Sequence, residues 1–371
     1  MSSKTSTSTA ADGNDTTNGD EQQQQHKNEI AMMKSMLLDT KVDGGKKSIW
    51  TMTIETFSMA DGKHKKHDVI VKTLEDGLEL LNEYVREREK VYAENKETKE
   101  EKNSKKKKKE KLMDLVPLSE FNATQDQFLT SFLKWAEQEE GNDGDKNKSK
   151  KNKEETKTTS TVINVSKAKR RLDAYFEWMD DNQDDFEEPL TIESISETAK
   201  LWDIQITYDD KGHFLWWIDL AKLDKDEIKK IAPRDHLRYV VWFSHLVMLD
   251  PKAQDNGAKI IENMGYLGFW KLATLVPHEL GAKMDRLTIG ILPVKMKQIY
   301  VFGAAKWMTI LMTLLKPFMG KKMRDRMVIL PNSTDIQTVC DELVSSRKNI
   351  PMDFCGIQGE AKRDAVFNKF K

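Results

Sequence analysis

The chain has 371 residues, of which 38% are hydrophobic and 33% are charged, and its formal net charge is −1. This length accommodates one domain of ordinary size and some accessory sequence, and the near-neutral balance gives no general reason to expect a nucleic-acid partner. The two cysteines, Cys340 and Cys355, have neither metal-site spacing nor the number for a disulfide framework, which indicates a reducing compartment.

No secretory signal or membrane-spanning segment is expected. The N-terminal sequence lacks an apolar core of the signal-peptide type. The longest apolar run is interrupted by Lys306 and Lys316 and is too short to cross ~30 Å of hydrocarbon. We therefore expect a cytoplasmic protein that is at most peripherally associated with membranes.

The first part of the chain divides into a polar segment and a small structured element. Residues 1–47 are rich in Ser, Thr, Asp and Gln at their start and are expected to be disordered. Ile49–Met59 alternates as a strand does, the Asp61-Gly62 turn follows, and Val69–Val71 is the expected partner strand. An apolar stripe beginning at Leu74 predicts a helix. Residues 48–111 form this element and a Lys-rich linker, and it is too small for a core of its own, so it should dock on the main domain.

The run Lys105–Lys109 is compatible with a nuclear signal, a membrane anchor or a solubilising linker, and the flanking Glu residues favour the linker.

Residues 112–190 predict a helical leader. Thr124 and Gln127 form a capping box before an apolar helical face that includes Phe128 and Phe132. Ser166 is the expected N-cap of a second helix. Between them, a Lys-rich stretch at about 139–160 reads as an inserted loop, which costs little closure entropy.

From Trp202 onward, short apolar strands alternate with helices. The expected strands are Ile204–Tyr208, Phe214–Leu220, Lys259–Glu262, Gln298–Phe302 and Met327–Leu330. The expected helices are Arg234–Leu249, Phe269–Thr274 and Glu279–Thr288. This alternation predicts an α/β layer with a largely parallel sheet.

The most informative stretch is Ile291–Leu330. A nearly all-apolar helix, Ala304–Leu315, ends at Lys316-Pro317-Phe318, and a cationic turn follows before the last strand. Periodicity alone favours a buried core helix, although a wall that meets lipid has the same pattern.

Motifs for catalysis or metal binding are missing from the sequence. No Gly-rich phosphate loop and no G-x-S-x-G elbow occurs, and His278-Glu279 lacks the second His of H-E-x-x-H. We predict no catalytic residues, no metal site and no cofactor. An enzyme with dispersed catalytic groups stays as a minor alternative.

The ordered features of Ile291–Leu330 resemble the CRAL-TRIO lipid-binding family, in particular its tocopherol-transfer and retinaldehyde-binding branch. The matching features are Pro293 with Lys295 and Lys297, the apolar Trp307–Leu315, Lys316-Pro317-Phe318, and Lys322, Arg324 and Arg326. Three further stretches resemble family motifs: Asp209–Phe214, Ala253–Gly265 with Glu262 or Asn263 near the usual acid, and Ile350–Gly356. The resemblance covers about Thr124–Gly356.

The resemblance implies a CRAL-TRIO fold: an N-terminal helical leader, a mostly parallel sheet of about five strands, and a gate helix over an apolar pocket. The lipid-binding domain would span 195–358, and 359–371 would form a tail. The expected pocket and gate residues are Trp216, Ile218, Ile261, Tyr300, Phe302, Met308, Leu311, Met312, Leu315 and Phe318.

The implied function is binding and intermembrane transfer of a small hydrophobic molecule or lipid. The cations would touch an anionic membrane transiently, since the family positions they match contact phosphoinositide headgroups; a solvated charged face is the alternative. These cations are Lys295, Lys297, Lys322, Arg324 and Arg326. Val294 stands where the phosphatidylinositol-transfer branch has an acid, which disfavours that lipid inside the pocket.

The main alternative function is a membrane-targeting adaptor or regulatory module without net transfer. In that case the N-terminal segment and the Lys-rich loop would bind protein partners.

Overall fold

The computed structural model describes residues 68–100, 111–139, 161–186, 188–265, 267–268, 278–319, 321–331 and several positions between 337 and 354. Four predicted segments lie outside the described residues: 1–47, the strand Ile49–Met59, the helix Phe269–Thr274 and the tail 359–371. Most of the Lys-rich loop at about 139–160 also lies outside them.

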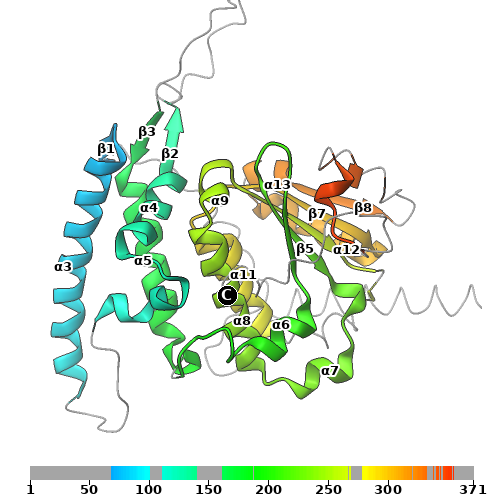
Figure 1. The fold of residues 1–371 in the computed structure, drawn as a ribbon, viewed down its shortest axis with the longest axis horizontal. Helices are drawn as coiled ribbons and strands as arrows, with labels where there is room; N and C mark the ends of the chain where they lie inside the picture. The colour runs from blue at the N-terminus through cyan, green and yellow to red at the C-terminus, as the bar shows by residue number, and fades with distance from the viewer. Residues whose placement is uncertain are drawn as a thin grey trace, which may run out of the picture. The chain divides into compact units, whose positions relative to one another are not determined.

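Three helices near the N-terminus lie side by side: α3 (Leu74–Glu100), α4 (Gln125–Ala136) and α5 (Val165–Asp181) (Figure 1). The hydroxyl of Tyr84 on α3 donates to the carboxylate of Asp173 on α5 at 2.7 Å, and Arg88 forms an ion pair with the same carboxylate. Two short 3₁₀ turns, η1 (Leu112–Leu115) and η2 (Leu118–Phe121), connect α3 to α4. Helix α3 is thus held against α5, and the docking of residues 48–111 on the main domain stays a prediction.

Capping of α4 and α5 is partly as predicted. Both bonds of the Thr124–Gln127 capping box are present, at 2.8 and 3.2 Å. The N-cap prediction for α5 is wrong, because the side chain of Asn164 accepts the capping bond from the amide of Lys167. Ser166 lies inside the helix, and its hydroxyl accepts instead from the amide of Val69, which ties the preceding strand to α5.

A small antiparallel sheet joins these helices, with strand order β1 (Ile70–Val71), β3 (Thr161–Asn164), β2 (Glu137–Glu139). The Lys-rich insertion therefore connects two paired strands, which the sequence analysis did not foresee. Strands of two to four residues are too short to show the alternation of apolar and polar residues by which a strand is recognised in a sequence.

The main sheet has the order β4 (Gln205–Tyr208), β5 (Phe214–Asp219), β6 (Ala258–Asn263), β7 (Met296–Ala304), β8 (Met327–Pro331). Only β4 is antiparallel to its neighbour. The predicted α/β fold with a mostly parallel five-stranded sheet is confirmed. It follows from apolar strands separated by segments long enough for crossover connections.

The helices around this sheet are α6 (Ser196–Trp202), α7 (Lys225–Lys230), α8 (Pro233–Leu249), α9 (Pro251–Asn256), α11 (His278–Asp285), α12 (Lys306–Leu315) and α13 (Lys321–Arg326). Short turns at Gln183–Phe186, Leu220–Lys222, Lys316–Phe318 and Arg347–Asn349 are 3₁₀ helices, and Arg286–Ile291 is a π-helical turn. The sequence predicted a cationic turn at Lys321–Arg326, but the segment is helix α13, supported by an i,i+4 ion pair between Lys321 and Asp325.

The β4–β5 hairpin is fixed by Asp209. Its carboxylate accepts from Lys259 on β6 at 2.8 Å and from the backbone amides of Lys211 and His213, and it contacts the His213 ring at 2.7 Å. Burial opposes ionisation of this carboxyl, but the bonds from Lys259 and His213 outweigh it, so the pKa of Asp209 is lowered. The turn also needs Gly212, whose φ is +74°.

Helices α5 and α8 meet through a buried polar pair. The hydroxyl of Tyr175 on α5 hydrogen-bonds Nε2 of His245 on α8, whose Nδ1 contacts the carbonyl of Val241 at 2.7 Å. Burial lowers the pKa of His245 to about 4, so the imidazole is neutral at physiological pH. Nearby, Arg171 donates to the carbonyl of Leu292 at 3.0 Å. These bonds join α5 to the sheet domain.

We predict that Tyr175→Phe destabilises the protein by about 1–3 kcal/mol, because a buried ring nitrogen of His245 loses its partner. Urea denaturation measures the change in unfolding free energy. Tyr92→Phe is the matched control, since it removes a half-buried hydroxyl that bonds Asp180 at 3.1 Å between α3 and α5. Equal losses in the two variants would contradict a special role for the Tyr175–His245 pair.

Candidate functional site

Alternation along the strands gives the main sheet two different faces. One face, which we call the C-terminal face, carries a buried cluster with residues of the C-terminal segment, notably Cys340, Ile350 and Phe354. The strand residues of this cluster are Leu215, Trp217, Ile261, Tyr300 and Phe302. The ring centroids of Trp217 and Phe354 lie 4.9 Å apart. Residues of the C-terminal segment therefore cover this face of the sheet.

The opposite face, which we call the helical face, lies under α8. The ring of Trp216 on β5 lies 4.5 Å from that of Phe243 on α8. Strand pairing places the other residues of this face beside one another: Ile218, Ile260, Glu262, Ile299, Val301, Met327 and Ile329. Helix α11 packs against α8 (Figure 1).

The predicted pocket residues are divided between these faces. Trp216 and Ile218 lie on the helical face, whereas Ile261, Tyr300 and Phe302 lie on the C-terminal face within its buried cluster. The sheet does not bring the two groups together. Neighbouring residues of a strand point to opposite faces of the sheet, so a shift of one position along the strand moves a side chain to the other face. The sequence alone does not tell which helices cover which face.

Helix α12, the predicted gate helix, is only partly buried. Trp307 is 3% exposed and its indole donates to the carbonyl of Leu267 at 2.9 Å, and Met312 is 8% exposed. The apolar residues Met308, Ile310 and Leu311 are half-buried. Leu315 and Phe318 belong to the same helical stretch, but their side chains lie outside the described part. A helix with this many half-buried apolar residues is not fixed in a core on all sides.

Two carboxyl groups were not among the predicted pocket residues. Glu262 lies on β6 in the helical face, and Asp285 ends α11. Glu262 is half-buried and Asp285 has exposed surface. Burial nevertheless raises the pKa of Glu262 to about 7, helped by the charge of Asp285, and burial raises the pKa of Asp285 to about 6.

The sequence pointed to Glu262, because the family that this stretch resembles has an acidic residue near that position. Nothing in the sequence pointed to Asp285, because its effect on the pKa of Glu262 arises only when the end of α11 approaches β6.

The predicted basic residues separate into two groups. Lys295 forms an ion pair with Glu137 on β2 at 2.8 Å. Lys297 is exposed, and its pKa is lowered by partial burial and then by repulsion from Lys295 and Arg326, which places the three cations close together. We call Lys295, Lys297 and Arg326 the cation cluster. Gly257, with φ of +87°, allows this close packing, because a Cβ there would lie 2.2 Å from the carbonyl oxygen of Lys295.

Arg324 has a different environment. Its guanidinium donates to the carbonyls of Lys316 and Met319, at 3.2 and 2.8 Å. These carbonyls lie at and just beyond the end of α12, so Arg324 supports the C-terminal end of the gate helix. The side chain of Lys322 lies outside the described part of the chain.

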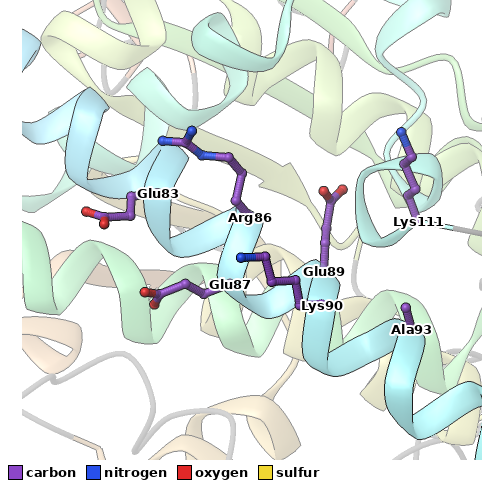
Figure 2. Close-up of a pocket in the computed structure, with 7 residues that line it drawn as sticks. All are labelled: Glu83, Arg86, Glu87, Glu89, Lys90, Ala93 and Lys111. Carbon is purple, nitrogen blue, oxygen red and sulfur yellow. The ribbon is translucent and has the colours of Figure 1, made fainter.

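Two surface hollows lie away from the sheet. The first, of ≈ 730 Å³, runs along α3, and Figure 2 shows its lining of mixed charge. The lining residues are Glu83, Arg86, Glu87, Glu89, Lys90, Ala93 and Lys111. The second, of ≈ 300 Å³, is bordered by η1, η2 and Glu188–Thr191. Charge of both signs makes the first unsuitable for an apolar ligand.

Within the described ranges, no three His, Cys, Asp or Glu side chains gather as metal ligands would. In the same ranges, no helix has the length and apolar content to cross a membrane.

Comparison with known proteins gives one family match, and it falls on the sheet domain. Residues 204–346 match the model of the CRAL/TRIO domain, from the start of β4 into the C-terminal segment. This fits the α/β fold described above. The match does not distinguish branches of the family, so the tocopherol-transfer and retinaldehyde-binding resemblance stays a prediction.

Other comparisons add little. The crystal structure of Sfh5 is similar at 14% sequence identity and a TM-score of 0.30, over 44% of this chain. This chain spans 60% of the length of that chain. A likeness of this extent carries no argument about function. No curated protein matches the chain.

We predict that Glu262→Gln stabilises the protein at pH 8 and has little effect at pH 4. Because folding raises this pKa, the folded protein binds more protons than the unfolded chain between about pH 4.5 and 7. Stability from the protonated carboxyl is present below that range and is lost as pH rises through it. The amide removes the ionisation. Thermal unfolding at both pH values measures the change, with exposed Glu227→Gln as control. An equal shift at pH 4 and pH 8 would show that Glu262 is ordinarily hydrated.

Proposed function

We propose that this protein binds one small hydrophobic molecule or lipid between the helical face and α12, and transfers it between membranes. The CRAL/TRIO match supports lipid binding or transfer in general, and binding rather than catalysis. The observation that carries the proposal is α12, whose apolar residues Met308, Ile310 and Leu311 are half-buried instead of packed in a core. A bound apolar molecule would complete their burial.

The physical basis of transfer is exchange between two apolar environments. Each buried CH₂ group contributes about 0.8 kcal/mol, so a lipid leaves a bilayer through water very slowly. An apolar pocket compensates most of that loss, and opening of the cover at the membrane then sets the rate. Bonds at the two ends of α12, from Trp307 and from Arg324, would have to break or shift for this helix to open as a unit.

The cation cluster is proposed as the membrane contact. Lys295, Lys297 and Arg326 lie at the starts of β7 and β8, and each cation near an anionic membrane contributes about 1 kcal/mol. Such a cluster holds the protein at a membrane transiently, consistent with a cytoplasmic, peripherally associated carrier that recognises anionic headgroups such as phosphoinositides. We include Lys322 and Arg324 in the proposed membrane contact, because they lie on α13, the helix that ends at Arg326.

Phosphatidylinositol is not proposed as the lipid inside the pocket. Val294 is 5% exposed and apolar, at the position where a headgroup would need an acid by family resemblance. The half-buried carboxyl of Glu262, when ionised, would in addition repel a phosphate group.

We predict that Met308→Asp with Leu311→Asp reduces lipid loading at least tenfold. The new carboxylates would face the bound lipid, and burying an unpaired charge costs several kcal/mol. Loading of a fluorescent phospholipid analogue measures the effect, with circular dichroism as the check of folding. Thr309→Asp with Thr313→Asp is the matched control, because it adds the same charge on exposed positions of the same helix. Unchanged loading in the folded Met308/Leu311 variant would reject α12 as a pocket wall.

We predict that Lys297→Gln with Arg326→Gln weakens binding to anionic liposomes and slows transfer, while ligand loading in solution stays within about twofold. Exposed charges are screened beyond about 8–10 Å at physiological salt, so parental membrane binding should fall steeply as salt rises. Co-sedimentation and a donor–acceptor transfer assay measure both effects. Lys229→Gln with Lys230→Gln on α7 removes the same charge elsewhere. If both variants sediment like the parent, the cluster is only a solvated face.

A further inference from the structure

The second surface hollow, between η1, η2 and the loop Glu188–Thr191, has a buried apolar floor. None of its lining residues belongs to the main sheet or to α12. Its volume of ≈ 300 Å³ lies at the lower end of the range for small-molecule sites, about 300–1,000 Å³. The floor residues are all less than a tenth exposed: Leu115, Val116, Met179, Phe186 and Leu190. The hollow therefore suits a small organic molecule with an apolar body.

The rim of this hollow carries charge of one sign. The carboxylates of Asp114, Glu120 and Glu188 belong to its lining, and no Lys or Arg is among the described residues that line it. The hollow along α3 differs, because cations stand beside its glutamates. A concave site with charge of one sign raises the local concentration of molecules of opposite charge. The rim therefore favours a cation.

Two of the rim carboxylates are held by neutral donors. Oε1 of Glu120 accepts a hydrogen bond from the amide of Ile192 at 2.7 Å, and Oδ2 of Asp114 accepts one from the amide of Lys111 at 2.9 Å. Within the described ranges, neither carboxylate forms an ion pair with a Lys or Arg side chain. Neutral amides orient these groups and leave their negative charge available to a ligand.

The loop that forms one wall is fixed from behind by Arg238 on α8. The guanidinium is 1% exposed and donates to the carbonyls of Glu188 and Pro189 at 3.0 and 2.8 Å. The carboxylate of Glu188 lies 3.6 Å from Arg234, but both side chains are exposed, and such a pair contributes little. The wall is thus formed before any ligand arrives, which reduces the entropic cost of binding.

We propose that the second hollow binds a small organic cation, whose apolar body covers the floor and whose ammonium or guanidinium group lies among the carboxylates of Asp114, Glu120 and Glu188. A neutral apolar molecule would gain nothing from the rim charge, and an anion would be repelled by it. A small cation without an apolar body would gain nothing from the floor. This site is separate from the proposed lipid pocket and does not depend on it.

The test uses the full chain with ¹³C-methyl methionine and four probes at neutral pH: phenethylamine, phenethyl alcohol, phenylpropionate and ethylamine. The methyl resonance of Met179 in the floor, assigned with Met179→Leu, reports binding by nuclear magnetic resonance. We expect phenethylamine to bind at least about threefold more tightly than the alcohol, and at least about tenfold more tightly than the anion or ethylamine.

Three results would overturn the proposal. The first is binding of phenethyl alcohol or phenylpropionate as tight as that of phenethylamine. The second is a Met179 resonance that responds to none of the probes. The third is a response of the Met312 resonance on α12 alone, which would place the amine in the proposed lipid pocket instead. Loading of a lipid analogue, measured separately, shows whether the proposed lipid-binding function stands.

A charge-neutralised rim locates the preference. Glu120→Gln with Glu188→Gln keeps an acceptor oxygen for the Ile192 amide and removes two charges, so it should weaken phenethylamine at least about threefold and leave phenethyl alcohol within about twofold. Glu193→Gln with Glu197→Gln is the matched control, because both residues are exposed and lie outside the hollow. Equal weakening in the two variants overturns the assignment to this rim. The comparison of probes on the parent protein stands even if a variant does not fold.

Discussion

The alternation of side chains along β5, β6 and β7 is the constraint on which the other features depend. It directs Trp217, Ile261 and Phe302 into the C-terminal face and Trp216, Ile218 and Glu262 into the helical face. The first face is closed by the chain, which makes the sheet a stable support. The second face includes the polar residue Glu262, and it is the face on which the proposed ligand would lie.

The remaining elements position this face. The Tyr175–His245 and Arg171–Leu292 bonds join α5 to α8 and to the turn before β7, while Lys295 reaches Glu137 on β2. The cation cluster at the strand starts and the bond network of Arg324 at the end of α12 thus belong to one connected region. In this proposal, contact with an anionic surface would occur near the C-terminal end of the cover helix, where Arg324 donates to the carbonyls of Lys316 and Met319.

The sequence predicted the five strands of the sheet domain and helices α8, α11 and α12 within a few residues, because these elements have strong apolar patterns and turn signals. It did not predict the short helices α6, α7 and α9. It could not predict which face of the sheet the C-terminal segment covers, so Ile261, Tyr300 and Phe302 were grouped with Trp216. Sequence also missed β2 and β3, which are too short for periodicity, and the capping by Asn164, where Ser166 offered an equally good local signal. Asp285 was missed because its influence on the pKa of Glu262 depends on the approach of two segments that are separate in the sequence. Clustering of Lys295, Lys297 and Arg326 was expected from family resemblance, whereas the distinct role of Arg324 required its hydrogen bonds.

The most direct test of the central claim is native mass spectrometry of the full chain after incubation with liposomes of mixed neutral and anionic lipids. A carrier with one pocket on the helical face predicts a single one-to-one lipid adduct that disappears on denaturation and is lost in the Met308→Asp/Leu311→Asp protein. The Thr309→Asp/Thr313→Asp protein should keep the adduct. A folded parent protein that shows only its unliganded mass after this incubation would contradict the account.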